Sequence, residues 1–109
     1  MTEPSSHDVV QLSGELDIER RDEVAAALLA AAPPRPALVD LSEVTYADST
    51  IISELLRFRM RAERGEQRIA ILVGTSRVVR LLEYAGLRDA FAIFEDRGSA
   101  LTFLCNATA

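Results

Sequence analysis

The sequence predicts a single α/β domain with a mostly parallel, mixed sheet of four to five strands and about four helices. Its 109 residues suffice for one hydrophobic core but not for two. Apolar residues make up 49% of the chain and charged residues 27%, which is typical of a globular domain. Short apolar runs alternate with segments of helical periodicity, and this alternation favours right-handed crossovers between parallel strands.

The expected elements follow the order strand, strand, helix, strand, helix, strand, helix, strand, helix. The domain is expected to span residues 8–105, with a short flexible N-terminus at 1–7 and a C-terminal tail at 106–109. In chain order we expect a strand at 8–12, a turn at 14–15 into a short extended piece ending at 16, a helix at 18–32, a strand at 37–41, a loop at 42–47, a helix at 49–63, a strand at 69–73, a helix at 77–85, a strand at 91–94 and a closing helix that starts within 96–99 and continues through 101 and 104.

Local signals mark the limits of the first elements. The runs DVVQL at 8–12 and ALVDL at 37–41 have the length and composition of strands, and the second is apolar enough to be buried on both faces. Asp17 stands where a helix N-cap is expected, because its carboxylate can accept a backbone N–H of the first turn. The prolines within 33–36 end the first helix, since proline has no N–H for the helical hydrogen bond.

The second half contains a long amphipathic helix and the clearest buried strand, IAILV at 69–73. The helix is expected to end at Gly65, a residue type common where the chain turns into the left-handed conformation. Helical spacing points an inner face of this helix toward the core, namely Ile51, Ile52, Leu55, Leu56, Phe58 and Ala62. A single core is expected to contain Leu38, Leu41, Leu55, Ile71 and Leu82.

Composition excludes several classes of function. The net charge of −5 argues against nucleic acid, which needs a positive surface. The sequence has no lysine, so it offers no phosphate-loop lysine and no Schiff base. His7 and Cys105 are the single histidine and the single cysteine, and together they cannot build a zinc site of the usual kind. We therefore expect no metal and no cofactor.

The chain is not expected to be an enzyme. An active site would have to use carboxylates and hydroxyls alone, for example Asp17 and Asp48 near Ser49, and no base of suitable pKa is visible. No apolar run approaches the ~20 residues of a membrane span, and the polar start does not resemble a signal peptide. We therefore expect a cytoplasmic binding protein that is a monomer or a weak dimer.

Four segments, in their order and spacing, resemble a known family. They are GELD at 14–17, VDLSEVTYADST at 39–50, RAERGEQRIAIL at 61–72 and SRVVRLLEYAGLRDAFAIF at 76–94. The ordered set resembles STAS domains of the anti-sigma factor antagonist type. The resemblance implies helices packed largely on one face of the sheet. It also implies a partner, an anti-sigma factor with serine kinase activity, and a phosphatase that resets the modified serine as a further partner.

The resemblance places a regulatory serine at Ser49. The D-S-[ST] element of the family matches Asp48, Ser49 and Thr50, and its first hydroxyl is the phosphorylation site. Asp17 matches the aspartate of GELD, which the family places near the phosphoserine. The chain differs from the family at Ile51, where glycine is usual, so a branched side chain is expected where a partner's backbone would approach. Asp17, Asp48, Thr50 and Ile51 thus form the expected switch region.

A serine at a helix start suits a switch for a physical reason. The first N–H groups of a helix lack partners and carry partial positive charge, and an unmodified serine is expected to cap one of them. A phosphate adds about −1.5 to −2 charges at that point, so a partner fitted to the hydroxyl is repelled while the fold survives. Two alternatives stay open: Ser49 is a cap alone, or the chain is an unphosphorylated STAS subunit of a lipid-transport or stress-signalling assembly.

Arginines recur on the second long helix at Arg57, Arg61 and Arg64. Their helical spacing predicts an outer, solvated face with a local pair between Glu54 and Arg57. A contact with an acidic partner is the alternative interpretation of the same three side chains.

Overall fold

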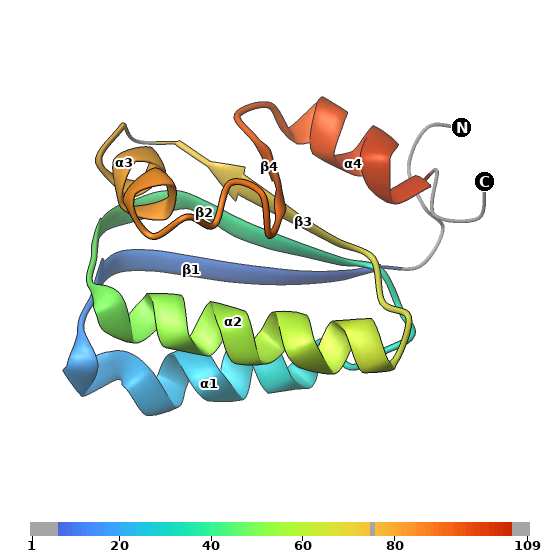
Figure 1. The fold of residues 1–109 in the computed structure, drawn as a ribbon, viewed down its shortest axis with the longest axis horizontal. Helices are drawn as coiled ribbons and strands as arrows, with labels where there is room; N and C mark the ends of the chain where they lie inside the picture. Colours follow the sequence, from blue (N-terminus) through green and yellow to red (C-terminus); the bar gives the residue numbers. More distant parts are fainter. Residues whose placement is uncertain (1–6, 75, 106–109) are drawn as a thin grey trace.

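The computed structural model describes residues 7–74 and 76–105, and it contains one four-stranded sheet with the strand order β1-β2-β3-β4 (Figure 1). The strands are β1 (Asp8–Leu16), β2 (Ala37–Ala47), β3 (Ile69–Val73) and β4 (Ala92–Phe94). A 3-10 turn, η1 (Ile18–Arg20), leads into the first of the helices, which are α1 (Arg21–Ala30), α2 (Ser49–Arg64), α3 (Ser76–Tyr84) and α4 (Arg97–Cys105). The expected tail and most of the expected N-terminal lead lie outside the described residues.

All strand pairs in the described part of the chain are parallel, which confirms the expected fold class. The two extended pieces expected before the first helix are one strand, because Gly14 adopts a positive φ of 76° and bends β1 without ending it. The register of β1 shifts on both sides of Ser13, which marks bulges. The prediction of a loop at 42–47 is wrong, since these residues continue β2 beside the end of β1.

Three helices cover one face of the sheet and α4 covers the other. The strand order equals the chain order, so successive right-handed crossovers place α1, α2 and α3 on the same face. Figure 1 shows α1 and α2 side by side along β1, and these helices contact each other. The chain passes to the other face only after β4, where α4 packs on β2, β3 and β4. The expected packing of helices largely on one face is confirmed.

The sheet separates two hydrophobic clusters, so the prediction of a single core is wrong for one of its five residues. Leu41, Leu55, Ile71 and Leu82 lie in the larger cluster under α1, α2 and α3. Leu38 belongs to the other cluster with Ala70, Leu72, Ala100, Leu101 and Leu104. Side chains alternate between the two faces of a strand, and therefore Leu38 points away from the α2 side.

The ends and faces of the helices differ from the expectation in three places. Residues 18–20, which were expected to begin the first helix, form the 3-10 turn η1 instead, and Ile18 in this turn is 67% exposed. Leu56 is 37% exposed rather than inward. Gly65 ends α2 with an ordinary φ of −99°. A Cβ at Gly65 would lie only 2.3 Å from the Cβ of Pro33, so close packing, and not a left-handed turn, explains the glycine.

Candidate functional site at the start of α2

Two strand-to-helix junctions lie side by side at one edge of the sheet. Leu16 and Ala47 are register partners at the ends of β1 and β2. Asp17 and Asp48 follow them directly, and the Asp48 N–H donates to the Leu16 carbonyl at 3.3 Å. The parallel pairing therefore brings the two predicted aspartates into one neighbourhood.

Both aspartates use the same local conformation to cap a helix. The Asp17 carboxylate accepts a hydrogen bond from the Glu19 N–H at 3.1 Å, and the Asp48 carboxylate accepts one from the Thr50 N–H at 2.9 Å. Their backbones are almost alike, with φ and ψ of −112° and −174° at Asp17 and −116° and −169° at Asp48. Each satisfies an N–H that its helix leaves without a partner.

Ser49 is the first residue of α2 and is exposed. The expectation that Ser49 caps the helix is wrong, because Asp48 holds that position. The Ser49 carbonyl accepts a hydrogen bond from the Ser53 hydroxyl at 3.4 Å, while the Ser49 hydroxyl makes no hydrogen bond within residues 7–74 and 76–105. The hydroxyl is therefore open to solvent and is not needed for capping.

Ile51 does not block the approach to Ser49. Its side chain is 3% exposed and packs in the larger cluster with Leu55 and Phe58. The expectation that this branched side chain lies where a partner approaches is therefore wrong. The core stripe of α2 begins at Ile51, so a glycine there would open a cavity instead of clearing a surface.

An ion pair between a buried carboxylate and an exposed arginine lies beneath this junction, and sequence reasoning missed it. Glu54 of α2 is 5% exposed and its carboxylate lies 3.1 Å from Nε of Arg21 on α1. Together with Asp17 and Thr50, these two residues line a narrow hollow between α1 and α2. The expected pair of Glu54 with Arg57 is wrong. The spacing of Glu54 next to the core stripe was the available signal for its burial.

The arginines of α2 serve different purposes. Arg61 is half-buried, donates to the Leu28 carbonyl at 3.0 Å and lies 5.5 Å above the Phe58 ring. It therefore ties α2 to α1, contrary to the expected outer position. Arg57 and Arg64 are exposed as expected.

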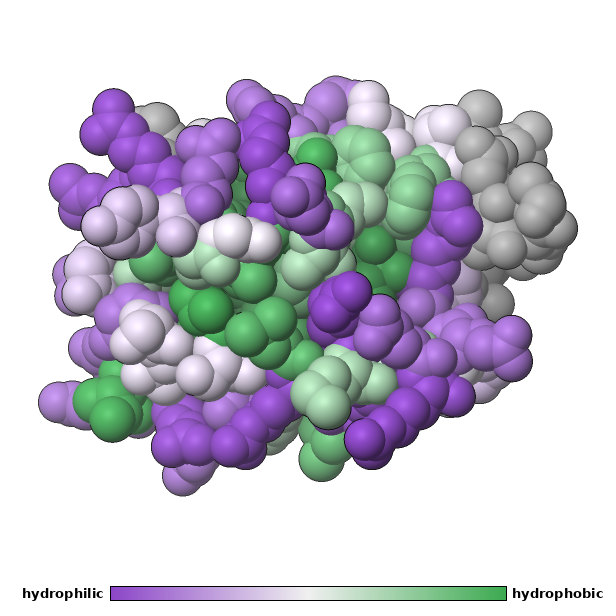
Figure 2. All heavy atoms as spheres, viewed as in Figure 1, coloured by the Kyte–Doolittle hydropathy of each residue, from purple (hydrophilic) through white to green (hydrophobic). Residues whose placement is uncertain are grey.

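The outer face of α2 carries apolar side chains in line with Ser49. Leu56 and Met60 are 37% and 53% exposed, and they follow Ser49 at seven and eleven positions, which places all three on one side of the helix. Figure 2 shows hydrophobic side chains gathered in the middle of this face of the molecule, with hydrophilic ones along its borders. An exposed serine at the end of an apolar stripe can be part of a protein contact surface.

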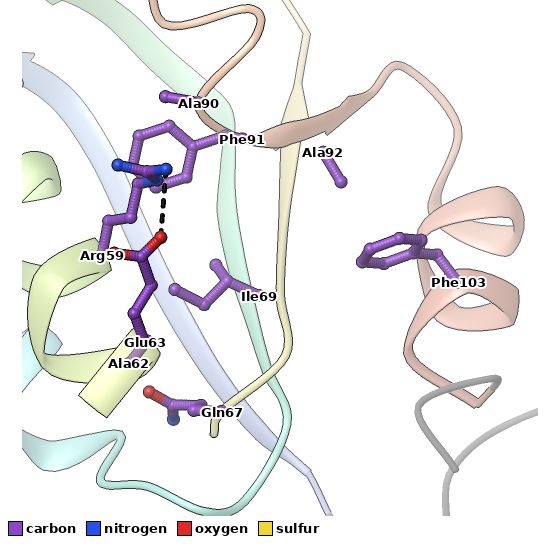
Figure 3. Close-up of a pocket in the computed structure, with 9 residues that line it drawn as sticks. All are labelled: Arg59, Ala62, Glu63, Gln67, Ile69, Ala90, Phe91, Ala92 and Phe103. Atoms are coloured by element: carbon purple, nitrogen blue, oxygen red, sulfur yellow. Dashed lines mark ion pairs between the residues drawn. The ribbon is translucent and has the colours of Figure 1, made fainter. Parts of the chain in front are cut away.

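A separate open hollow lies near the other end of α2 (Figure 3). Ile69 and Phe91 form an apolar wall, and Arg59 and Glu63 pair with each other at 3.1 Å. The Gln67 amide group donates to the backbone carbonyls of Ala31 and Arg35 and so anchors the loop before β2. These polar groups hold the fold together and do not form a reactive pair.

The described residues contain no cluster of three His, Cys, Asp or Glu side chains that could hold a metal ion. In the same part of the chain, no helix combines the length and the apolar character that crossing a membrane requires.

A family model described as "Mlab, STAS domain" matches residues 1–95 of the chain. No curated protein sequence matches it. An anti-sigma factor antagonist from Mycobacterium paratuberculosis is similar in structure, with 21% identity, a TM-score of 0.85 and coverage of 97% of this chain and 92% of that one.

Two further solved structures are similar over most of their length. An anti-sigma-factor antagonist (STAS) domain protein from Planctomyces limnophilus has 21% identity, a TM-score of 0.81 and coverage of 93% of this chain and 96% of that one. A sulfate transporter family protein from Wolinella succinogenes has 16% identity, a TM-score of 0.81 and coverage of 99% and 92%. Likeness at such identities concerns the fold, while the family rests on the sequence match over residues 1–95.

Proposed function

The chain belongs to the STAS domain family, and on this premise we propose that it is an anti-sigma factor antagonist switched by phosphorylation at Ser49. The partner is an anti-sigma factor with serine kinase activity in the cytoplasm, and binding it releases a sigma subunit. The kinase transfers the terminal phosphoryl group of ATP to the Ser49 oxygen, the hydroxyl proton leaves with the kinase's base, and ADP is released. A phosphatase resets the switch by hydrolysis. The chain itself, a monomer or weak dimer, catalyses neither step.

The observation that carries this proposal is that the Ser49 hydroxyl is exposed and that the cap of α2, which Asp48 provides, does not depend on this hydroxyl. Asp48 already caps α2 through the Thr50 N–H, so modifying Ser49 removes no hydrogen bond of the helix start. A phosphate on the first residue of α2 lies at the positive end of the helix, where negative charge is tolerated. The folded domain is therefore expected to persist in both states of the switch.

The contact surface changes sharply even though the fold does not. Asp17 and Asp48 already make this edge acidic, and a phosphate adds about −1.5 to −2 further charges. A partner seated against Ser49 and the apolar stripe of Leu56 and Met60 would then face a bulky, strongly negative group. Repulsion and loss of fit release the partner.

Phosphosite mapping and partner affinity together test the proposal. The purified chain is incubated with ATP and an anti-sigma kinase of the same organism, and intact mass and peptide mapping locate the phosphate. Ser49→Ala should stay unmodified and bind the kinase constitutively, whereas Ser49→Asp should bind at least tenfold more weakly. Thr50→Ala is the matched control and should be phosphorylated like the wild type. Label on Thr50 alone, or full affinity of Ser49→Asp, contradicts the switch.

A second candidate is an unphosphorylated interaction subunit of another complex, such as a lipid-transport or stress-signalling assembly. The description of the matching family model names Mlab and not an anti-sigma factor antagonist, which favours a role outside sigma regulation. In that case Ser49→Asp should weaken assembly, but no kinase should label Ser49.

A further inference from the structure

A third surface hollow adjoins the switch region and is not explained by it. Its lining consists of Tyr46, Ala47, Arg77, Arg80, Leu81 and Tyr84, and we refer to it as the tyrosine hollow. Tyr46 and Ala47 end β2 three and two positions before Ser49, while the other four residues lie on α3. Their spacing along α3 is that of one helix face. The tyrosine hollow is therefore next to the start of α2 in the fold.

The hollow concentrates aromatic side chains in an exposed position. The sequence has two tyrosines and no tryptophan, and both tyrosines line this hollow. Tyr84 is 96% exposed and Tyr46 is 41% exposed. Large aromatic side chains gain free energy when they leave water. Two of them around one half-buried leucine, Leu81, thus form a site with an apolar floor.

The rim of the hollow carries two positive charges that the fold does not use. Arg77 and Arg80 are exposed, and neither takes part in an ion pair within the described part of the chain. Most other described arginines are paired, for example Arg21 with Glu54 and Arg97 with Asp40. Arginine and tyrosine dominate the side chains that carry binding energy at protein interfaces. The chain as a whole has a net charge of −5, but Arg77 and Arg80 make the rim of the hollow locally positive. This local charge favours a negatively charged partner.

We propose that the tyrosine hollow binds an acidic segment of the protein partner. An apolar side chain of that segment enters between Tyr46 and Tyr84, and flanking carboxylates pair with Arg77 and Arg80. This inference rests on the proposed function in one respect, which is that the same partner covers Ser49. An acidic partner also explains why charge at Ser49 is an effective signal, because a phosphate beside the hollow repels its carboxylates directly.

The probe is the peptide acetyl-Asp-Glu-Phe-Glu-Asp-amide, titrated into the ¹⁵N-labelled full chain and followed by amide chemical shifts. We expect shifts at Tyr46, Ala47 and along the exposed face of α3. The peptide with alanine in place of phenylalanine, and a peptide with lysine in place of each acidic residue, should each bind at least tenfold more weakly. Equal binding of all three peptides overturns the proposal.

A charge-matched pair of variants separates a specific site from general attraction. The double variant R77E/R80E should lose at least tenfold in affinity for the acidic peptide, and Tyr84→Ala should lose several-fold. The control R57E/R64E makes the same change in net charge on α2 and should bind within twofold of the wild type. An equal loss in the control shows general electrostatic attraction and overturns the proposal. All replaced side chains are exposed, and circular dichroism checks that the fold is retained.

The outcome is independent of the kinase experiment. Peptide binding at the hollow without any label on Ser49 overturns the phosphorylation switch and supports the tyrosine hollow. Labelling of Ser49 without peptide shifts on α3 overturns the tyrosine hollow alone.

Discussion

At the scale of single residues, Asp48 and Ser49 divide two tasks between neighbouring positions. Asp48 fixes the start of α2 by accepting the Thr50 N–H, and Ser49 presents an exposed hydroxyl. If the serine were the cap, a kinase would have to pull its oxygen away from the helix. With an aspartate as the cap, modification and helix stability are independent of each other.

This division predicts that substitution at Asp48 lowers the free energy of unfolding more than substitution at Ser49. Asp48→Ala should lower the free energy of unfolding by about 0.5–2 kcal/mol, the usual cost of losing an N-cap. Ser49→Ala should change it by less than about 0.5 kcal/mol, as for other surface positions. Urea denaturation of the two variants measures the difference, with Asp17→Ala as a second cap variant. A larger loss for Ser49→Ala than for Asp48→Ala would be inconsistent with this capping.

The sequence predicted which residues meet at the start of α2 better than it predicted their surroundings on the helix. Asp17 as a cap is confirmed, because a lone aspartate between a strand and a helix has one obvious use. Asp48 and Ser49 are both good caps, so the sequence could not decide between them. Helical spacing placed Ile51 in the core, which is confirmed, and only the comparison with the family's glycine suggested a surface position. Leu56 is rotated by about 100° from the buried Leu55, so the predicted inner face was too wide at that residue.

At the scale of elements, one buried carboxylate attaches α4 to the sheet. Asp40 of β2 is 1% exposed. It accepts hydrogen bonds from the Ser42 N–H at 2.9 Å and the Ser42 hydroxyl at 2.6 Å, and it pairs with Arg97 at the start of α4. Burial by itself raises the pKa of Asp40, but the Ser42 hydrogen bonds and the Arg97 charge together hold that pKa below its usual value.

The lowered pKa of Asp40 predicts a pH-dependent contribution to stability. Because the carboxylate is favoured in the folded state, its contribution is complete above the unfolded pKa of about 3.9 and is lost as the pH falls through the folded pKa. Asp40→Asn should therefore lower the free energy of unfolding at pH 7 by about 1–3 kcal/mol. The gap to the wild type should shrink below about pH 4.

Urea unfolding at pH 7, 5, 4 and 3 measures this gap. Arg97→Gln is the matched variant, which removes the ion pair but keeps both Ser42 hydrogen bonds, so its loss at pH 7 should be smaller. A gap between Asp40→Asn and the wild type that stays constant across this range contradicts the assigned role of the carboxylate.

Element boundaries were predictable where a strong local signal stands at them. The strand at 69–73 and the start of α2 at Ser49 are confirmed. The merging of two predicted strands into β1 was not predictable, because Gly14 signals a bend and a turn equally well. The extension of β2 to Ala47 depends on pairing with β1, and pairing is not visible in a local pattern.

At the scale of the whole molecule, the sheet divides the interior into two clusters that should respond independently. Leu38→Ala and Leu55→Ala should each lower the free energy of unfolding by about 2–5 kcal/mol. Because these residues lie on opposite faces, the double variant should show the sum within about 0.5 kcal/mol. Leu38→Ala combined with Leu104→Ala, from one cluster, should deviate from its sum by more. Denaturation of all five variants decides this, and coupling between Leu38 and Leu55 would refute two separate clusters.

The parallel sheet was predictable, because alternation of strands and helices together with crossover handedness restricts the topology. The packing of helices largely on one face was implied by the family resemblance. The face of the sheet on which Leu38 lies was not predictable from the sequence. A strand such as ALVDL, apolar on both faces, lacks the alternation that would assign each side chain to a face. The tyrosine hollow could not be predicted from the sequence either, since its residues come from β2 and α3, about thirty positions apart.

The all-parallel sheet has a consequence for how the chain folds. Among the strands that the structure describes, none pairs with its partner through a tight hairpin, and each register joins residues about twenty to thirty positions apart. The entropy of closing such loops must be overcome before any ladder bond forms, so pairing is slow compared with helix formation. Helices α1, α2 and α3 can form first and shorten the chain between successive strands. The crossover helices therefore reduce the length of flexible chain that each strand pairing has to close.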